Sequence, residues 1–94
     1  MQIYEPSTDF TNDMLCALRV KPNDRAVKEV TDLIMAAEAD LQGQGVDHID
    51  LSDPLTKQAI KLYCKAHYGY DDNSEKYLAA YQALSLSMAL LSDY

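Results

Sequence analysis

The sequence predicts an all-α protein: a compact bundle of about four helices with a short N-terminal arm. Three observations support this fold class. Apolar residues recur at spacings of three and four over long segments, helix-capping residues stand between these segments, and no two segments with strong strand-like alternation are available to pair. The chain has 94 residues, 48% of them apolar, so we expect one small domain whose thin core makes self-association or a partner a natural source of stability.

The N-terminal arm is expected over residues 1–10, which have no sustained period and contain Pro6, and the single helical domain over residues 11–94. Thr11 is the expected N-cap of a first helix over about residues 12–20. The sequence KPND that follows is expected to end this helix. The apolar face of the helix consists of Met14, Leu15 and Leu18.

The clearest helix begins after Asn23 or Asp24 and is expected to end at Gly43 and Gly45, because both glycines can adopt the left-handed conformation that closes a helix. Its apolar stripe, with Leu33 beside it, consists of Val27, Val30, Ile34, Ala37 and Leu41. Three acidic residues are expected elsewhere around the cylinder: Glu29, Asp32 and Glu38.

The segment QGVDHIDLSD alternates weakly and is consistent with a short strand or a loop, of which we favour the loop. Ser52 or Asp53 then offers an N-cap, and Pro54 suits the first helical position because its missing N–H costs no hydrogen bond there. A third helix is expected over about residues 54–68. Its apolar line is Leu55, Ala59, Leu62 or Tyr63, and Ala66, with Ile60 adjacent and a basic stripe of Lys57, Lys61 and Lys65 opposite.

The third helix is expected to stop at Gly69, and Asp72 with Glu75 has the spacing of a capping box, with Ser74 a competing cap. A fourth helix is expected over about residues 74–91. Its predicted buried residues are Tyr77, Leu78, Tyr81, Leu84, Met88 and Leu91. The stretch LSLSMALL within it also alternates as a strand would, but no second strong strand is available to pair with it, so the helix is favoured.

The net charge of −7, from 15 acidic and 8 basic residues, argues against binding of a nucleic-acid backbone, which needs Lys and Arg to replace counterions. The two cysteines, Cys16 and Cys64, fall on separate predicted helices, and no positively charged start precedes an apolar stretch. We therefore expect a reducing, cytoplasmic setting. No apolar run approaches the roughly 20 residues that span a bilayer, so no membrane role is expected.

The stretch YCKAHYGYDDNSEKY invites a chemical interpretation, which we weigh against a simple corner between two helices. Cys64 and His67 are spaced to face one metal, but zinc needs three or four ligands, and both cysteines are better explained as small buried residues. The acidic run from Asp71 lacks the glycine and closing glutamate of a calcium loop and the further carboxylates of a nucleotidyl transferase. A serine nucleophile is not expected either, because no serine lies in the glycine-flanked turn that exposes such a residue. We expect no catalytic residue, metal or cofactor.

Tyrosines are concentrated around the same corner, which holds Tyr63, Tyr68, Tyr70, Tyr77 and Tyr81. One interpretation is a packed corner whose hydroxyls reach solvent. The other is that Tyr68 and Tyr70 lie in an interface, where tyrosine is enriched. The residues expected in interfaces are Tyr68, Tyr70, Asp71, Asp72, Leu86, Met88 and Tyr94.

The segments TNDMLCALRV and VTDLIMAAEADL, together with residues 53–94, which include YCKAHYGYDD and a Leu-Ser-Leu tail, resemble the small head-tail connector proteins of tailed bacteriophages. These are also called head-completion or DNA-packaging adaptor proteins. The resemblance implies an all-α fold and a non-enzymatic virion protein. Members tend to end in a tail that engages the portal, whereas this sequence stops at Tyr94 just after the fourth helix, so the arm or residues 84–94 would make that contact.

The resemblance further implies that copies dock as a ring, usually of twelve, beneath the portal after DNA packaging. The ring would extend the DNA channel and meet the portal protein and the next connector or tail-completion protein. The protein would be made in the bacterial host cytoplasm and reside at the head-tail interface. Its acidic charge would let DNA pass without specific binding. The alternative is a small acidic helical binding module, an inhibitor or DNA mimic that acts on a host protein.

Overall fold

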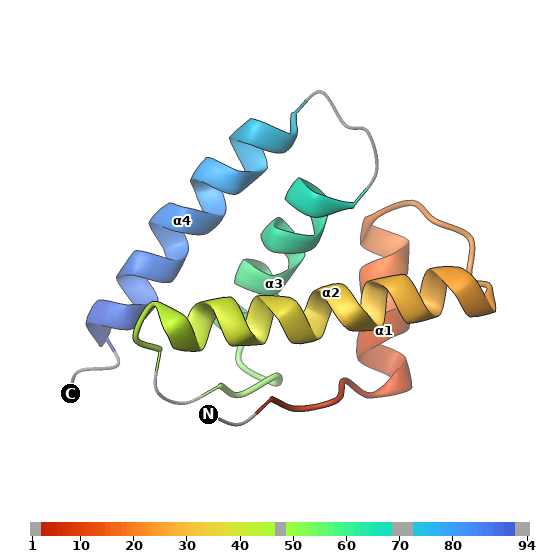
Figure 1. The fold of residues 1–94 in the computed structure, drawn as a ribbon, viewed down its shortest axis with the longest axis horizontal. Coiled ribbons are helices and arrows are strands. Elements are labelled where there is room, and N and C mark those ends of the chain that lie inside the picture. Colours follow the sequence, from red (N-terminus) through yellow and green to blue (C-terminus); the bar gives the residue numbers. More distant parts are fainter. Residues whose placement is uncertain (1–2, 47–48, 69–72, 92–94) are drawn as a thin grey trace.

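Among the residues that this computed structural model describes, four helices follow one another: α1 (Thr8–Ala17), α2 (Asp24–Gly43), α3 (Pro54–His67) and α4 (Ser74–Leu91) (Figure 1). The structure describes residues 3–46, 49–68 and 73–91. No strand occurs within these ranges, which confirms the predicted all-α bundle of about four helices. Residues 84–91 are helical, so the strand alternative for this stretch is wrong.

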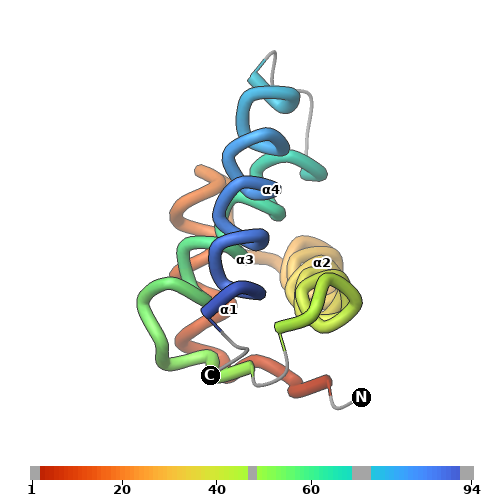
Figure 2. The backbone as a smooth tube through the Cα atoms, turned by 90° about the vertical axis from the view of Figure 1, so that its left-hand side faces the viewer, coloured from red at the N-terminus to blue at the C-terminus, as the bar shows by residue number. Residues whose placement is uncertain are grey.

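The helix α2 lies across the other three helices, and the view in Figure 2 looks along its axis. The helices α3 and α4 lie side by side and run in opposite directions (Figure 1). The core fills the space between these layers. Its most deeply buried apolar side chains are Leu15, Val30, Ile34, Ala37, Leu41, Ala59, Ile60, Cys64 and Tyr81. In the described part of the chain, no helix has both the length and the apolar character that crossing a membrane requires.

The start of α1 differs from the prediction because Ser7, not Thr11, caps the helix. The Ser7 hydroxyl oxygen accepts a hydrogen bond from the Phe10 backbone N–H at 3.1 Å, as an N-cap side chain does. Thr11 is instead buried within the helix. The expected boundary of the arm after residue 10 therefore falls too late, since residues 8–10 are already helical.

The end of α1 is a Schellman motif that precedes the sequence KPND, so KPND does not end the helix as predicted. The Val20 N–H donates to the Leu15 carbonyl at 3.0 Å. The Arg19 N–H donates to the Cys16 carbonyl at the same distance. Arg19 has φ 59°, the left-handed position that glycine usually fills in this motif. Because arginine occupies it, a glycine-based signal did not mark this helix end.

The ends of α2 agree with the prediction. Asn23 caps the helix by accepting a hydrogen bond from the Ala26 N–H at 2.9 Å. Gly43 is the last helical residue, and Gly45 has φ 105°. The buried face is rotated slightly from the predicted one, because Ala26 is buried and Val27 is exposed.

The bounds of α3 and α4 are also close to those predicted. Asp53 caps α3, and Pro54 is its first residue. The buried faces differ in part. Leu55 is 45% exposed, while Thr56 and Cys64 lie against the core. In α4, Leu91 is 56% exposed rather than buried, and Ser85 is fully buried in the core.

Candidate functional site

The residues expected in interfaces lie in different environments. Tyr68 is the half-buried C-cap of α3 and packs against the core. Leu86 is 61% exposed, as a contact residue needs to be. Met88 is only 5% exposed, which confirms its predicted burial in the fourth helix: it lies two turns after Tyr81, on the face of α4 that meets the core. Its expected role in an interface stays a prediction. Four others lie outside the described residues: Tyr70, Asp71, Asp72 and Tyr94.

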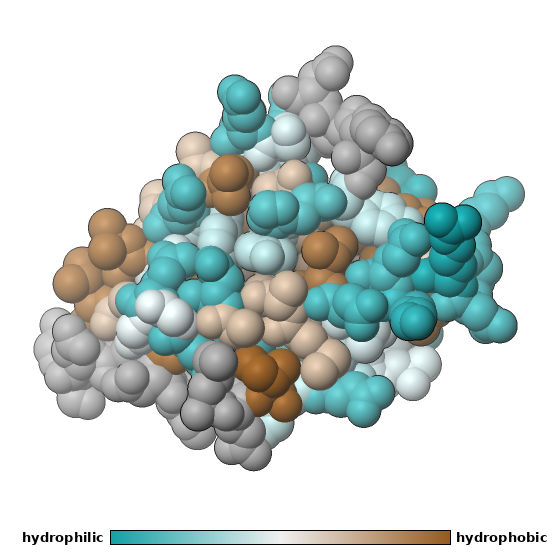
Figure 3. Space-filling model, viewed as in Figure 1, coloured by the Kyte–Doolittle hydropathy of each residue, from teal (hydrophilic) through white to brown (hydrophobic). Residues whose placement is uncertain are grey.

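An apolar stripe runs along the outer face of α4. The stripe consists of Ala79, Ala83, Leu86 and Leu90. Spacings of four, three and four place these exposed residues on the side of the helix opposite the core. Leu86 and Leu90 are 61% and 63% exposed, and Figure 3 shows hydrophobic surface over the C-terminal half of α4, at the left of the view. Contiguous exposed apolar surface of this kind marks interaction sites in soluble proteins.

A polar cluster joins the same helix to α2. The Tyr81 hydroxyl donates to Asp40 Oδ2 at 2.5 Å, and Gln44 Nε2 donates to the same oxygen at 2.6 Å. The Ser85 hydroxyl donates to Gln44 Oε1 at 2.6 Å. Tyr81 and Ser85 are buried, so these partners replace the water that their hydroxyls lose on folding. The cluster therefore fixes the position of α4 along α2.

Burial, the hydrogen bond to Asp40 and the negative charge of Asp40 raise the pKa of Tyr81 far above its ordinary value. The hydroxyl thus stays protonated and acts as a hydrogen-bond donor. Sequence reasoning placed Tyr81 in the core but missed the cluster. The available signal was a pair of matching i, i+4 spacings, Asp40 to Gln44 on one helix and Tyr81 to Ser85 on the other.

Aromatic side chains of the described part of the corner pack against one another, while the interface expected for Tyr68 and Tyr70 stays a prediction, since Tyr70 lies outside the described residues. The Tyr63 ring meets the Tyr81 ring edge-to-face, with 5.2 Å between centroids, and the His67 ring at 4.2 Å. Lys65 Nζ lies 5.4 Å from the centroid of the Tyr77 ring. These contacts tie α3 to α4, although the hydroxyl of Tyr81 is buried and does not reach solvent.

The two cysteines have different environments. Cys64 is buried as expected, and burial raises the pKa of its thiol to about 12, which leaves the nucleophilic thiolate scarce at neutral pH. Cys16 is exposed, contrary to expectation. Within residues 3–46, 49–68 and 73–91, no three His, Cys, Asp or Glu side chains are grouped to hold a metal ion.

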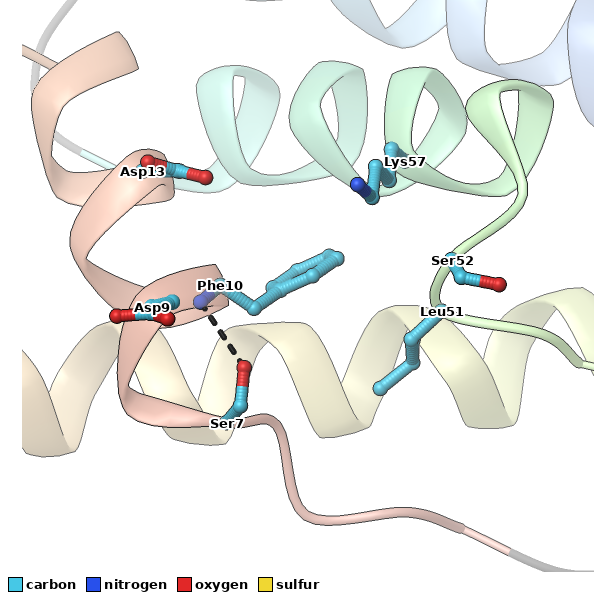
Figure 4. A pocket seen from close by; sticks show the side chains of 7 residues that line it. All are labelled: Ser7, Asp9, Phe10, Asp13, Leu51, Ser52 and Lys57. Atoms are coloured by element: carbon cyan, nitrogen blue, oxygen red, sulfur yellow. Dashed lines mark hydrogen bonds between the residues drawn. The ribbon is translucent and has the colours of Figure 1, made fainter.

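A groove between α1 and α3 has a volume of about 340 Å³ (Figure 4). Phe10 extends into it, with Asp13 on α1 and Lys57 on α3 along its sides. Its full lining is Ser7, Asp9, Phe10, Asp13, Leu51, Ser52 and Lys57. This lining offers contact with an apolar group flanked by opposite charges. It includes neither His nor Cys and so lacks the usual pairing of a nucleophile with a base.

Glu38 is a buried carboxylate that the sequence placed away from the core. Its Oε1 accepts a hydrogen bond from the Tyr4 backbone N–H at 2.9 Å, while its buried Oε2 has no hydrogen-bond partner among the described residues. Burial raises the pKa of Glu38, and the hydrogen bond from Tyr4 opposes this shift only in part. Glu38 therefore anchors the N-terminal segment to α2 at a cost in solvation.

The substitution Glu38→Gln is expected to raise the free energy of unfolding at pH 7 by about 1 kcal/mol, because it removes a poorly solvated charge and keeps an acceptor for the Tyr4 N–H. The pKa of Glu38 in the folded state is raised above the ordinary value of 4.5, so folding favours the protonated carboxyl. The stability that this provides is fully present below pH 4.5 and is lost as the pH rises through the folded-state pKa. The gain from glutamine should therefore shrink toward pH 4.

Urea unfolding between pH 4 and pH 8 measures this difference. The matched control is Glu29→Gln, on the same helix, which breaks only an exposed ion pair with Arg25 and should change stability by less than about 1 kcal/mol. A glutamine variant at Glu38 that is less stable than the natural protein at pH 7, or a gain that does not depend on pH, would contradict the assignment.

The stripe on α4, the polar cluster, the groove and the Glu38 anchor are thus the distinctive features of the described residues. Comparisons with protein-family models, with curated proteins and with solved structures find no match to this chain. The residues of the chain itself therefore carry any assignment of function.

Proposed function

We propose that this protein is a structural subunit of a phage virion, a head-tail connector that docks as a ring beneath the portal after DNA packaging. The observation that supports this role is the outer face of α4. Its two leucines are more than half exposed, and no charged residue occurs between Tyr77 and Leu91. A helix that is apolar on both its inner and outer faces is typical of a position inside an assembly. The protein would act through contact rather than catalysis.

In this role, the outer face of α4 binds the portal protein, and the corner around Tyr68 faces the next connector or the tail-completion protein. The net charge of −7 on each copy is multiplied in the ring, so like charge surrounds the DNA. The backbone then passes through the channel without specific binding. The site of action is the head-tail interface of the virion.

Co-sedimentation with the portal assembly of the same phage tests this proposal. Saturable binding with a ring-like number of copies per portal is expected. Leu86→Glu should weaken that binding by at least tenfold, because it buries a charge in the contact. The matched control is Leu55→Glu, the same change at an exposed leucine on α3, and it should bind as the natural protein does.

Two outcomes would overturn the connector role. One is a protein that stays unbound beside a portal shown to be competent for assembly. The other is binding that Leu86→Glu and Leu55→Glu weaken equally, since the contact would then not lie on the outer face of α4. The first outcome would favour the small acidic inhibitor.

A further inference from the structure

Side-chain size changes along the outer face of α4. The N-terminal half of the stripe carries alanine, at Ala79 and Ala83, and the C-terminal half carries leucine, at Leu86 and Leu90. The four positions have the spacing of a two-helix seam, in which every second gap is three and the others are four. We propose that this face packs against the same face of a second copy of the chain, with the two α4 helices antiparallel.

The register of the pair follows from the sequence numbers. The two-fold axis crosses the helix pair at the level midway between positions 84 and 85. Ala79 then faces Leu90 of the partner subunit, and Ala83 faces Leu86 of the partner subunit. Each leucine then fills the space that a facing alanine leaves, and all four layers have equal volume, as close packing requires. A parallel pair would instead set leucine against leucine at one end and alanine against alanine at the other.

The absence of charge on this face permits a second copy as the occupant. Residues 77–91 contain no charged side chain, while the whole chain carries −7, so two copies repel through the rest of their surfaces but not here. A charged partner surface would lose its hydration against this face and gain no counter-charge. The Ser87 hydroxyl, beside the stripe, donates to the Ala83 carbonyl at 3.2 Å, so covering it leaves no unmet hydrogen bond.

The size of the contact sets its strength. Fifteen helical residues extend about 22 Å, and a single helix pair of this length buries less than the roughly 1,200 Å² of a stable complex. The dimer is therefore weak and reversible. The pairing does not rest on the connector role. If both hold, the dimer covers the surface that binds the portal and must dissociate before docking.

Sedimentation equilibrium of the full chain, alone, between about 5 μM and 1 mM tests the pairing. A monomer–dimer equilibrium is expected for the natural protein. Leu86→Glu should weaken dimerisation at least tenfold, since the symmetric contact contains the substitution twice, while Leu55→Glu should leave it unchanged. A natural protein that is monomeric at 1 mM, that forms larger assemblies, or that responds equally to both substitutions would overturn the proposal. Circular dichroism confirms that both variants remain folded.

Disulfide trapping tests the antiparallel orientation. In a Cys16→Ser background, with Cys64 fully buried, Ala79→Cys and Leu90→Cys variants are oxidised separately and as an equal mixture. The antiparallel pair predicts a mixed disulfide only, because two copies of position 79 lie about 16 Å apart along the axis, beyond the roughly 7 Å that a disulfide spans between Cα atoms. Disulfides within either variant alone, or no cross-link in the mixture, would refute this arrangement.

Discussion

Replacing Tyr81 by alanine is expected to lower the free energy of unfolding by about 3–5 kcal/mol, because the change leaves a large cavity between α3 and α4. Tyr81 is 1% exposed and is the largest of the fully buried side chains. Its ring packs on Tyr63, and its hydroxyl supplies the hydrogen bond that links α4 to Asp40 on α2. Both contacts are lost together in the alanine variant.

The variant Tyr81→Phe separates the two contributions. It keeps the ring and removes only the hydroxyl, and Asp40 is exposed, so water can replace the lost donor. We expect a loss of about 1 kcal/mol, measured by urea unfolding alongside the alanine variant. If phenylalanine and alanine destabilise the protein equally, the hydrogen bond rather than the packing of the ring holds α4 in place, and the account given for Tyr81 is wrong.

Leu41→Ala is expected to lower the free energy of unfolding by about 2–5 kcal/mol. Leu41 is fully buried in the last turn of α2, and its carbonyl accepts the Val46 N–H at 3.1 Å in the turn that closes the helix. Truncation of the side chain opens a cavity in the core, next to the turn that follows α2.

The matched control is Leu90→Ala, the same change on the outer face of α4. Because Leu90 is 63% exposed, the loss should stay within about 0.5 kcal/mol when thermal or urea unfolding is measured at micromolar protein concentration, where self-association is slight. Equal losses at Leu41 and Leu90 would show that the outer face of α4 belongs to the core and would remove the basis for an exposed stripe.

Helix ends set by local chemistry were predictable from the sequence. Asn23, Asp53 and Gly45 each satisfy backbone groups within a few residues, so their roles follow from residue type and position. The start of α1 was not predictable in this way, because Ser7 and Thr11 are both good caps. The burial of Thr11 against the rest of the fold, a tertiary effect, selects Ser7.

Polar burial was the part of the candidate site that the sequence did not reveal. Ser85 is buried because Gln44, 41 positions away, accepts its hydrogen bond. Glu38 is bonded to the backbone of Tyr4, 34 positions away. In α4, apolar residues occur on both the inner and the outer face, so periodicity alone did not decide which side meets the core. This is why Met88, which is 5% exposed, was predicted both in the core and in an interface, whereas Leu86 is 61% exposed.

The order of helix packing bears on how copies of the chain enter any assembly. The most extensive contacts join consecutive helices: α1 with α2, α2 with α3, and α3 with α4. Helical domains with such local contacts fold in microseconds to milliseconds, whereas synthesis of 94 residues takes roughly 5 to 20 s. Each copy is thus expected to fold as soon as α4 leaves the ribosome. The rate at which copies assemble would then be set by subunit concentration and encounter, not by folding.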